Sequence, residues 1–111
     1  MSEDTLARLA AAIAARRSAT ASISYTKSLL DKGISACAKK FGEEATETII
    51  ASISESDRRL RDEAADLLYH LLVLLEARNI TLESVLNELD RRTVQSGHAE
   101  KASRTKSGGT S

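Results

Sequence analysis

The sequence predicts an all-α fold, a bundle of about five helices that is completed by dimerisation. Its 111 residues include no proline and only 5 glycines, and they are rich in Ala, Leu, Glu, Arg and Lys, which lose little freedom on a helix. Apolar residues recur at helical spacing. Because only 3% of the residues are aromatic, the core must be aliphatic. A single domain of this length buries a modest fraction of its surface, which favours a second subunit.

The first predicted helix covers residues 2–17, where Leu6, Leu9 and Ile13 follow one another at helical spacing. A polar link over residues 18–24 separates it from the next helix. We therefore expect one face of this helix to contribute aliphatic side chains to the bundle.

Three further helices are predicted before residue 80. The second is short, over residues 25–31, with Ser24 as a suitable N-cap and Gly33 as its stop. The third covers residues 35–54 and the fourth residues 57–78. The turn over residues 54–56 separates these two helices.

The fifth predicted helix covers residues 82–92, and a polar tail follows it. We expect residues 1–93 to form the folded domain. Residues 94–111 contain almost no apolar side chains, so they cannot build a core and are expected to be partly mobile.

Charge and composition exclude several function classes. The 16 basic and 16 acidic side chains cancel, so no overall basic bias points to nucleic acid. The apolar run over residues 67–75 is far shorter than the roughly 20 residues of a membrane span, and no membrane partner is expected. The single Cys37 cannot form an intrachain disulfide and is expected to be a small buried hydrophobe. These features favour the cytoplasm.

Acidic residues gather on one stripe of the predicted third helix. At about 100° per residue, Glu43, Glu44 and Glu47 share this stripe with Lys40. The roughly opposite face is apolar, with Ile34, Phe41, Ala45 and Ile49. Taken alone, the acidic stripe is typical of an ordinary solvated helix face.

The predicted fourth helix makes the acidic residues unusual. Glu63, Asp66 and His70 lie on a stripe that continues into apolar Leu67, Val73 and Leu74. Buried carboxylates are costly unless they are paired or bind a cation. Arg59 and Lys40 could provide the pairing, and a metal ion is the other explanation. His70 is expected to be a core or interface residue rather than a ligand.

A cluster of carboxylates favours hard cations, so the cofactor expected here is Mg²⁺, with Mn²⁺ as the alternative. Such an ion neutralises phosphate charge and polarises an attacking water. Lys39 and Lys40 precede the acids by one turn and could contact phosphate oxygens, although a solvated face explains them equally well. The chain has no Gly-rich phosphate loop.

The spacing of the five acids resembles the signature of the all-α, MazG-type nucleoside triphosphate pyrophosphohydrolases. More specifically, residues 3–104 resemble the phosphoribosyl-ATP pyrophosphatase family. The similar segments are SYT at 24–26, KKFGEEATE at 39–47, EAADLLYHLLVLL at 63–75, ELDRR at 88–92 and SGHAEKASR at 96–104.

This resemblance implies hydrolysis of phosphoribosyl-ATP to phosphoribosyl-AMP and pyrophosphate, the second step of histidine biosynthesis. Water would attack the α–β phosphoanhydride with the help of Mg²⁺. The implied catalytic and metal-binding residues are Glu43, Glu44, Glu47, Glu63 and Asp66. The implied substrate contacts are Lys39, Lys40, Ser24, Tyr25, Arg91 and Arg104. The family also implies a homodimer with helices of both subunits around the site, and a role for the tail near substrate or partner.

Two other functions fit part of the pattern. A house-cleaning pyrophosphohydrolase acting on ordinary or damaged nucleoside triphosphates would need the same acids. A non-catalytic helical dimerisation module would explain the leucines of the fourth helix, but not Glu63 and Asp66 beside them.

Overall fold

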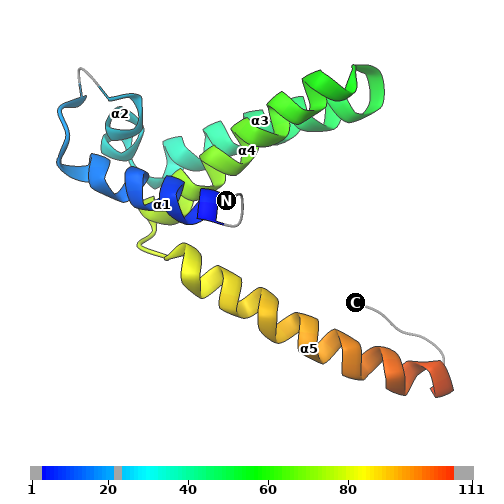
Figure 1. Ribbon diagram of the computed structural model, residues 1–111. Coiled ribbons are helices and arrows are strands. Elements are labelled where there is room, and N and C mark those ends of the chain that lie inside the picture. Colours follow the sequence, from blue (N-terminus) through cyan, green and yellow to red (C-terminus); the bar gives the residue numbers. More distant parts are fainter. Residues whose placement is uncertain (1–3, 22–23, 107–111) are drawn as a thin grey trace. The chain divides into compact units, whose positions relative to one another are not determined.

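The computed structural model describes residues 4–21 and 24–106, and for residues 95–106 it describes only the helical backbone. Within these residues the chain consists of helices and the turns between them, without strands, so the predicted all-α fold is confirmed (Figure 1). No described helix is long and apolar enough to cross a membrane. The chain divides into two compact units, Met1–Thr81 and Leu82–Ser111. The separation of a folded domain from a tail near residue 93 stays a prediction.

The first unit begins with α1 (Thr5–Ala15), which continues into a single 3₁₀ turn, η2 (Arg16–Ser18). This turn includes the last two residues of the predicted first helix and the first residue of the predicted polar link. Arg17 attaches it to the end of α4, where its guanidinium donates hydrogen bonds to the Glu76 carboxylate, the Glu76 carbonyl and Asn79 Oδ1. The Glu76 carbonyl also accepts a hydrogen bond from the Asn79 N–H at 3.0 Å, so Arg17 adds to the capping of the last turn of α4.

The short α2 (Tyr25–Lys32) begins and ends where the sequence predicts. Ser24 Oγ accepts a hydrogen bond from the backbone N–H of Lys27 at 3.1 Å, which caps the first turn. Gly33 ends the helix with a φ of +96°, a conformation that L side chains rarely adopt. The chain therefore turns at Gly33 directly into the next helix.

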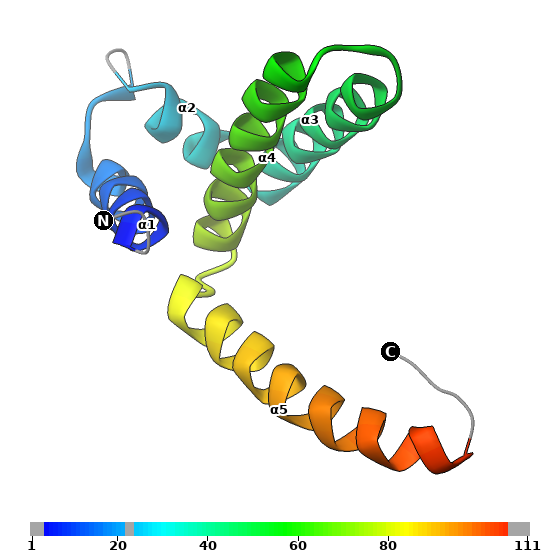
Figure 2. The same ribbon diagram turned by 45° about the vertical axis from the view of Figure 1, so that its right-hand side comes forward.

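Two long helices form the main body of the first unit. α3 (Ile34–Ser54) and α4 (Asp57–Ala77) lie side by side as an antiparallel hairpin (Figure 2). Ser56 Oγ caps α4 by accepting a hydrogen bond from the Arg59 N–H at 3.2 Å. α1 packs against α4, and α2 packs against both long helices.

The core of the first unit is small and aliphatic, as the composition predicts. Cys37 is a buried hydrophobe that is 1% exposed, and its thiol donates to the Leu29 carbonyl at 3.4 Å. Each of the four helices contributes at least one side chain to the buried hydrophobic set, which is Ile13, Leu29, Cys37, Ala51, Leu72 and Val73.

The buried face of α3 differs from the one that its hydrophobic pattern predicts. Cys37, Glu44 and Ala51 recur every seven residues and are all buried. A solvated acidic stripe is therefore the wrong interpretation for Glu44, although Glu43 and Glu47 are exposed. The small side chains at 37 and 51 let this face approach α4 closely, and Glu44 lies midway between them.

On the predicted apolar face of α3, Phe41 and Ala45 are half-buried, but the isoleucines are exposed in the single chain. Ile34, Ile49 and Ile53 are 47%, 59% and 80% exposed. We refer to these three residues as the outer isoleucine face. Exposed aliphatic side chains in a row are typical of a surface that another element covers.

The second unit consists of α5 (Leu82–Lys106), so the prediction that this helix ends at Arg92 is wrong. The prediction relied on the loss of apolar residues after Arg92. A helix can continue through polar residues that have adequate helix propensity, and no proline interrupts this segment. Glu88 accepts hydrogen bonds from Arg91 and Arg92 one turn later. These two guanidinium groups lower the pKa of Glu88 to about 2.

Candidate metal centre

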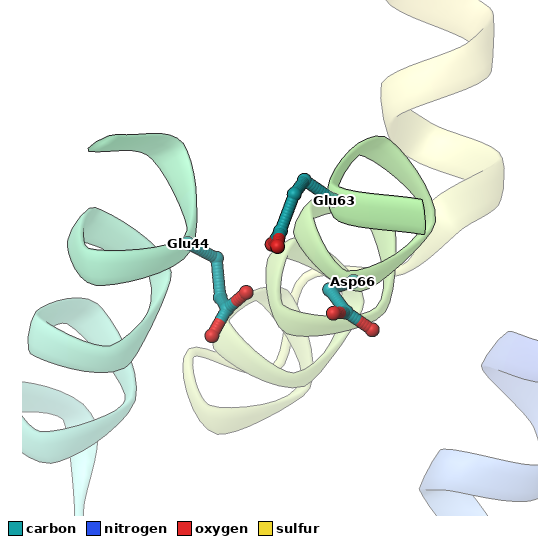
Figure 3. Close-up of side chains that lie close together, drawn as sticks. All are labelled: Glu44, Glu63 and Asp66. Atoms are coloured by element: carbon teal, nitrogen blue, oxygen red, sulfur yellow. The ribbon is translucent and has the colours of Figure 1, made fainter. Parts of the chain in front are cut away.

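Three carboxylates from the two long helices meet in one place. Glu44 on α3 and Glu63 and Asp66 on α4 each offer an oxygen, and these oxygens all lie within 4.8 Å of one another. Figure 3 shows Glu44 reaching from α3 toward α4, where Glu63 and Asp66 project from neighbouring turns. We refer to these three residues as the carboxylate cluster. Two of its members are buried and Asp66 is exposed, so the cluster is accessible from one side.

Helical spacing explains how the chain brings these side chains together. Glu63 and Asp66 are three residues apart on α4, and residues at this spacing are neighbours on one helix face. Glu44 projects from the face of α3 that also carries buried Cys37 and Ala51. The hairpin packing that buries the small residues therefore also brings Glu44 to the two acids.

The two buried carboxylates each have one oxygen without a partner. Glu44 Oε1 and Glu63 Oε1 accept no hydrogen bond from any described residue. Leaving a buried polar group unsatisfied costs about 1–3 kcal/mol, and more when it is charged. A cation between the helices would satisfy both oxygens. The donor set consists of carboxylate oxygens only, which fits Mg²⁺ or Mn²⁺ rather than a metal that prefers nitrogen or sulfur.

Basic side chains balance only the other oxygen of each buried carboxylate. Lys40 Nζ lies 3.6 Å from Glu44 Oε2 and 3.6 Å from Glu43 Oε1. Arg59 donates to Glu63 Oε2 at 2.9 Å. Pairing with Arg59 and Lys40, the explanation without a metal, is thus partly correct, but it leaves the Oε1 atoms unexplained.

The pKa of Glu63 is raised above its ordinary value. Burial is the largest cause, the nearby carboxylate of Glu47 adds to it, and Asp66 adds further. Arg59 opposes this shift. Crowded carboxylates repel one another, and a cation among them relieves the repulsion. The electrostatics therefore agree with the unsatisfied oxygens.

The five predicted acids do not occupy equivalent positions. Glu44, Glu63 and Asp66 form the cluster, and Glu47 lies near Glu63. Glu43 is exposed and pairs with Lys40 on the outside of α3. The metal-binding roles of Glu43 and Glu47 stay predictions.

The predicted substrate contacts are more scattered. Lys40 flanks the cluster, while neighbouring Lys39 is exposed. Ser24 is buried as the cap of α2, and the Tyr25 ring is 54% exposed. On α5, Arg91 pairs with Glu88, and the Arg104 side chain lies outside the described residues.

His70 lies one turn beyond Asp66 and is buried, with 6% of its surface exposed. Its ring makes edge contacts with Tyr25 and Tyr69. Burial lowers its pKa, although acids of the site, Glu44 first among them, act in the opposite direction. The expected role as a core histidine agrees with this environment.

Thr48 joins the two helices at the level of the cluster, a role that the sequence does not reveal. Its hydroxyl lies 2.8 Å from the carbonyl of Glu44 and 3.2 Å from the carbonyl of Glu63. The first contact is the usual one of a helical threonine with the preceding turn. The second crosses to α4, so this one side chain connects the backbones that carry both buried acids.

Comparison with known proteins places the chain in a family. The family model for phosphoribosyl-ATP pyrophosphohydrolase matches residues 6–93. This chain belongs to the phosphoribosyl-ATP pyrophosphohydrolase family. Among its relatives, the phosphoribosyl-ATP pyrophosphatase of Azorhizobium caulinodans is 58% identical, over 96% of this chain and 100% of that protein. The family resemblance is therefore confirmed.

Two other relatives carry the same name. The phosphoribosyl-ATP pyrophosphatase of Erythrobacter litoralis is 55% identical, over 91% of this chain and 97% of the relative. That of Zymomonas mobilis is 50% identical, over 96% of this chain and 100% of the relative. The similarity thus extends over nearly the full length of each protein.

Replacing Thr48 with valine tests the connection between the two helices. Thr48→Val keeps the shape but removes the hydroxyl, so we expect the free energy of unfolding to fall by about 1 kcal/mol. We also expect Mg²⁺ to bind severalfold more weakly, since the buried acids lose their shared support. Urea unfolding and calorimetric titration with Mg²⁺ measure the two effects.

Thr46→Val is the matched control, because the Thr46 hydroxyl bonds only within α3, to Gly42 at 3.1 Å. This variant should bind Mg²⁺ as the unchanged protein does, and Thr48→Ser should restore binding. Equal Mg²⁺ affinity in the two valine variants would show that the contact across the helices has no effect on the site.

Proposed function

We propose that this chain hydrolyses phosphoribosyl-ATP to phosphoribosyl-AMP and pyrophosphate, the second step of histidine biosynthesis. The observation that carries the proposal is the pair of buried, unpartnered carboxylate oxygens, Glu44 Oε1 and Glu63 Oε1, beside the exposed Asp66. Carboxylates of this kind suit a phosphate-containing substrate, because Mg²⁺ is usually bound by one or two carboxylates together with substrate phosphates. The names of the relatives identify phosphoribosyl-ATP as the substrate to test.

In this proposal the carboxylate cluster holds Mg²⁺, with Mn²⁺ as a possible replacement, and Glu43 and Glu47 are further candidate ligands. When bound, the ion would neutralise phosphate charge and make water a better nucleophile at the α–β phosphoanhydride. One carboxylate of the set accepts the proton of the attacking water.

Basic residues around the cluster supply the contacts to phosphate. Lys40 already lies 3.6 Å from Glu44 Oε2, at the edge of the cluster, and its ammonium group suits a phosphate oxygen. Lys39 is the second proposed phosphate contact. Ser24, Tyr25, Arg91 and Arg104 remain proposed contacts to the rest of the substrate.

We also propose that two copies of the chain form a homodimer through the outer isoleucine face. Ile49 and Ile53 are 59% and 80% exposed, although they lie on the more apolar side of α3. Burying an isoleucine fully stabilises an assembly by about 1.5–3 kcal/mol. A second copy would bury these side chains without covering the opposite side of α3, which carries Glu44. Location in the cytoplasm stays a prediction.

The two alternative functions are separable. The carboxylate cluster fits a house-cleaning nucleoside triphosphate pyrophosphohydrolase equally well, but the names of the relatives favour phosphoribosyl-ATP. A non-catalytic dimerisation module has no use for two buried carboxylates with unsatisfied oxygens. The cluster therefore favours an enzyme.

A substrate panel tests the proposed reaction. The purified protein with Mg²⁺ should release pyrophosphate from phosphoribosyl-ATP faster than from ATP, dCTP or dUTP. Release is measured with a coupled pyrophosphate assay, and the nucleotide product is identified by mass. Faster turnover of dCTP or dUTP would support the house-cleaning alternative instead.

Removing one charge from the cluster tests the metal site. Glu63→Gln should abolish the rise in melting temperature that Mg²⁺ produces, because a ligand that binds only the folded state stabilises it. Activity should fall by at least about a hundredfold. The control is Asp62→Asn, which removes an exposed charge next to Glu63 in sequence and should leave the Mg²⁺ effect intact. An undiminished Mg²⁺ effect in Glu63→Gln would contradict the site.

Charges on the outer isoleucine face test the homodimer. The double variant Ile49→Lys, Ile53→Lys should sediment as a monomer, whereas the unchanged protein sediments as a dimer. Ser54→Lys adds the same charge next to Ile53 but away from this face, and it should leave the dimer intact. A double variant that still sediments as a dimer would place the interface elsewhere.

A further inference from the structure

The chain has few aromatic residues, and one of them, Tyr25, is exposed and contacts His70, which follows Asp66 of the carboxylate cluster by one turn of α4. Its aromatic residues are one Phe and two Tyr, with no Trp. Tyr25 begins α2 and is 54% exposed. Its ring stacks on Tyr69 of α4 with centroids 6.5 Å apart and planes at 22°. It also meets the edge of His70 at 6.0 Å and 90°.

The groups beneath the Tyr25 ring are held in place. The Tyr69 hydroxyl is hydrogen bonded to Thr26 Oγ1, which ties α4 to the first turn of α2. His70 is buried and packs edge-on against Tyr69 at 4.8 Å. Ser24 caps the same turn of α2. The exposed ring therefore rests on a fixed support, unlike an ordinary surface tyrosine that is free to move.

The Tyr25 hydroxyl interacts electrostatically with charged residues of the site. Burial raises the pKa of Tyr25, Lys40 opposes this, and Glu44 and Glu43 act on the hydroxyl as well. Lys40 Nζ in turn lies 3.6 Å from Glu44 Oε2. Lys40 thus interacts with both Tyr25 and the cluster, and His70, which the Tyr25 ring contacts, follows Asp66 by one turn of α4. A ligand whose phosphates occupy the Lys40 side of the cluster has its remaining part within reach of the ring.

We propose that Tyr25 is a stacking surface for the purine base of the nucleotide. The inference rests on the proposed function, because the phosphates at the carboxylate cluster bring the base to this position. An aromatic ring offers a flat face to a base and contributes to affinity by stacking. A ring that stacks on the base does not contact the α–β phosphoanhydride that reacts, so its loss should raise KM more than it lowers kcat.

The absence of tryptophan permits a direct optical test, since Tyr25 and Tyr69 are the only tyrosines. In Tyr69→Phe the fluorescence comes from Tyr25 alone. With Mg²⁺ present, α,β-methylene-ATP, which resists cleavage at the α–β bridge, should quench this signal. Tripolyphosphate, which has no base, should leave it unchanged. In the control Tyr25→Phe the remaining Tyr69 signal should respond to neither ligand.

Affinity gives a second measurement of the same contact. Tyr25→Leu should bind α,β-methylene-ATP about tenfold more weakly by calorimetry, while its affinity for tripolyphosphate is unchanged. Tyr25→Phe keeps the ring and should bind the nucleotide within about twofold of the unchanged protein. With phosphoribosyl-ATP, Tyr25→Leu should show a higher KM.

The outcomes separate this inference from the proposed function. If Tyr25→Leu binds the nucleotide as tightly as the unchanged protein, or Tyr25 fluorescence ignores it, the stacking role is wrong and the hydrolase assignment stands. If the unchanged protein releases no pyrophosphate from phosphoribosyl-ATP, the proposed function fails. Should Tyr25→Leu not fold by circular dichroism, the fluorescence of Tyr69→Phe decides.

Discussion

Two carboxylates buried between α3 and α4, each with one oxygen left without a partner, are the feature on which the rest of this structure depends. Glu44 and Glu63 are 7% and 6% exposed, and their Oε1 atoms find no partner among the described residues. Such an arrangement is unfavourable for folding alone, because buried charge must be compensated. Lys40 and Arg59 compensate the other oxygen of each acid. These pairs offset part of the cost of burying the two acids, and the two Oε1 atoms are left to accept a cation.

The three carboxylates of the cluster come from one hairpin, so helix packing alone brings them together. Small side chains at Cys37 and Ala51 allow α3 to approach α4, and Thr48 connects the two backbones at the level of the acids. A cation that binds between the helices would strengthen the same contact that positions its ligands. In the proposed site, folding of the hairpin and affinity for metal would consequently be coupled.

Much of the fold could be predicted, because Ser24, Gly33 and the helical spacing are local signals. Glu63 and Asp66 were also detectable, since they interrupt an apolar stripe. The burial of Glu44 was not, because the apolar residues of α3 lie on the other side and a single sequence does not show which face packs. The sequence does not distinguish the role of Thr48 from that of Thr46. Each hydroxyl bonds to the carbonyl four residues earlier, Thr48 to Glu44 and Thr46 to Gly42, and only the structure shows the second contact of Thr48 with α4. The metal-binding role of the acids stays a prediction.

On α3 a glutamate is buried while isoleucines are exposed, and the different surroundings of its two sides explain this arrangement. The side toward α4 is buried but carries Glu44 between the small residues Cys37 and Ala51, so it packs without a large aliphatic core, and the cluster is reached beside exposed Asp66. The side with Ile49 and Ile53 carries no such group and is free to bury apolar surface. In the proposed homodimer the second copy would supply the missing burial on that side. The helix would then gain stability from the partner while its acids stay accessible to metal and phosphate, which a single small core could not provide.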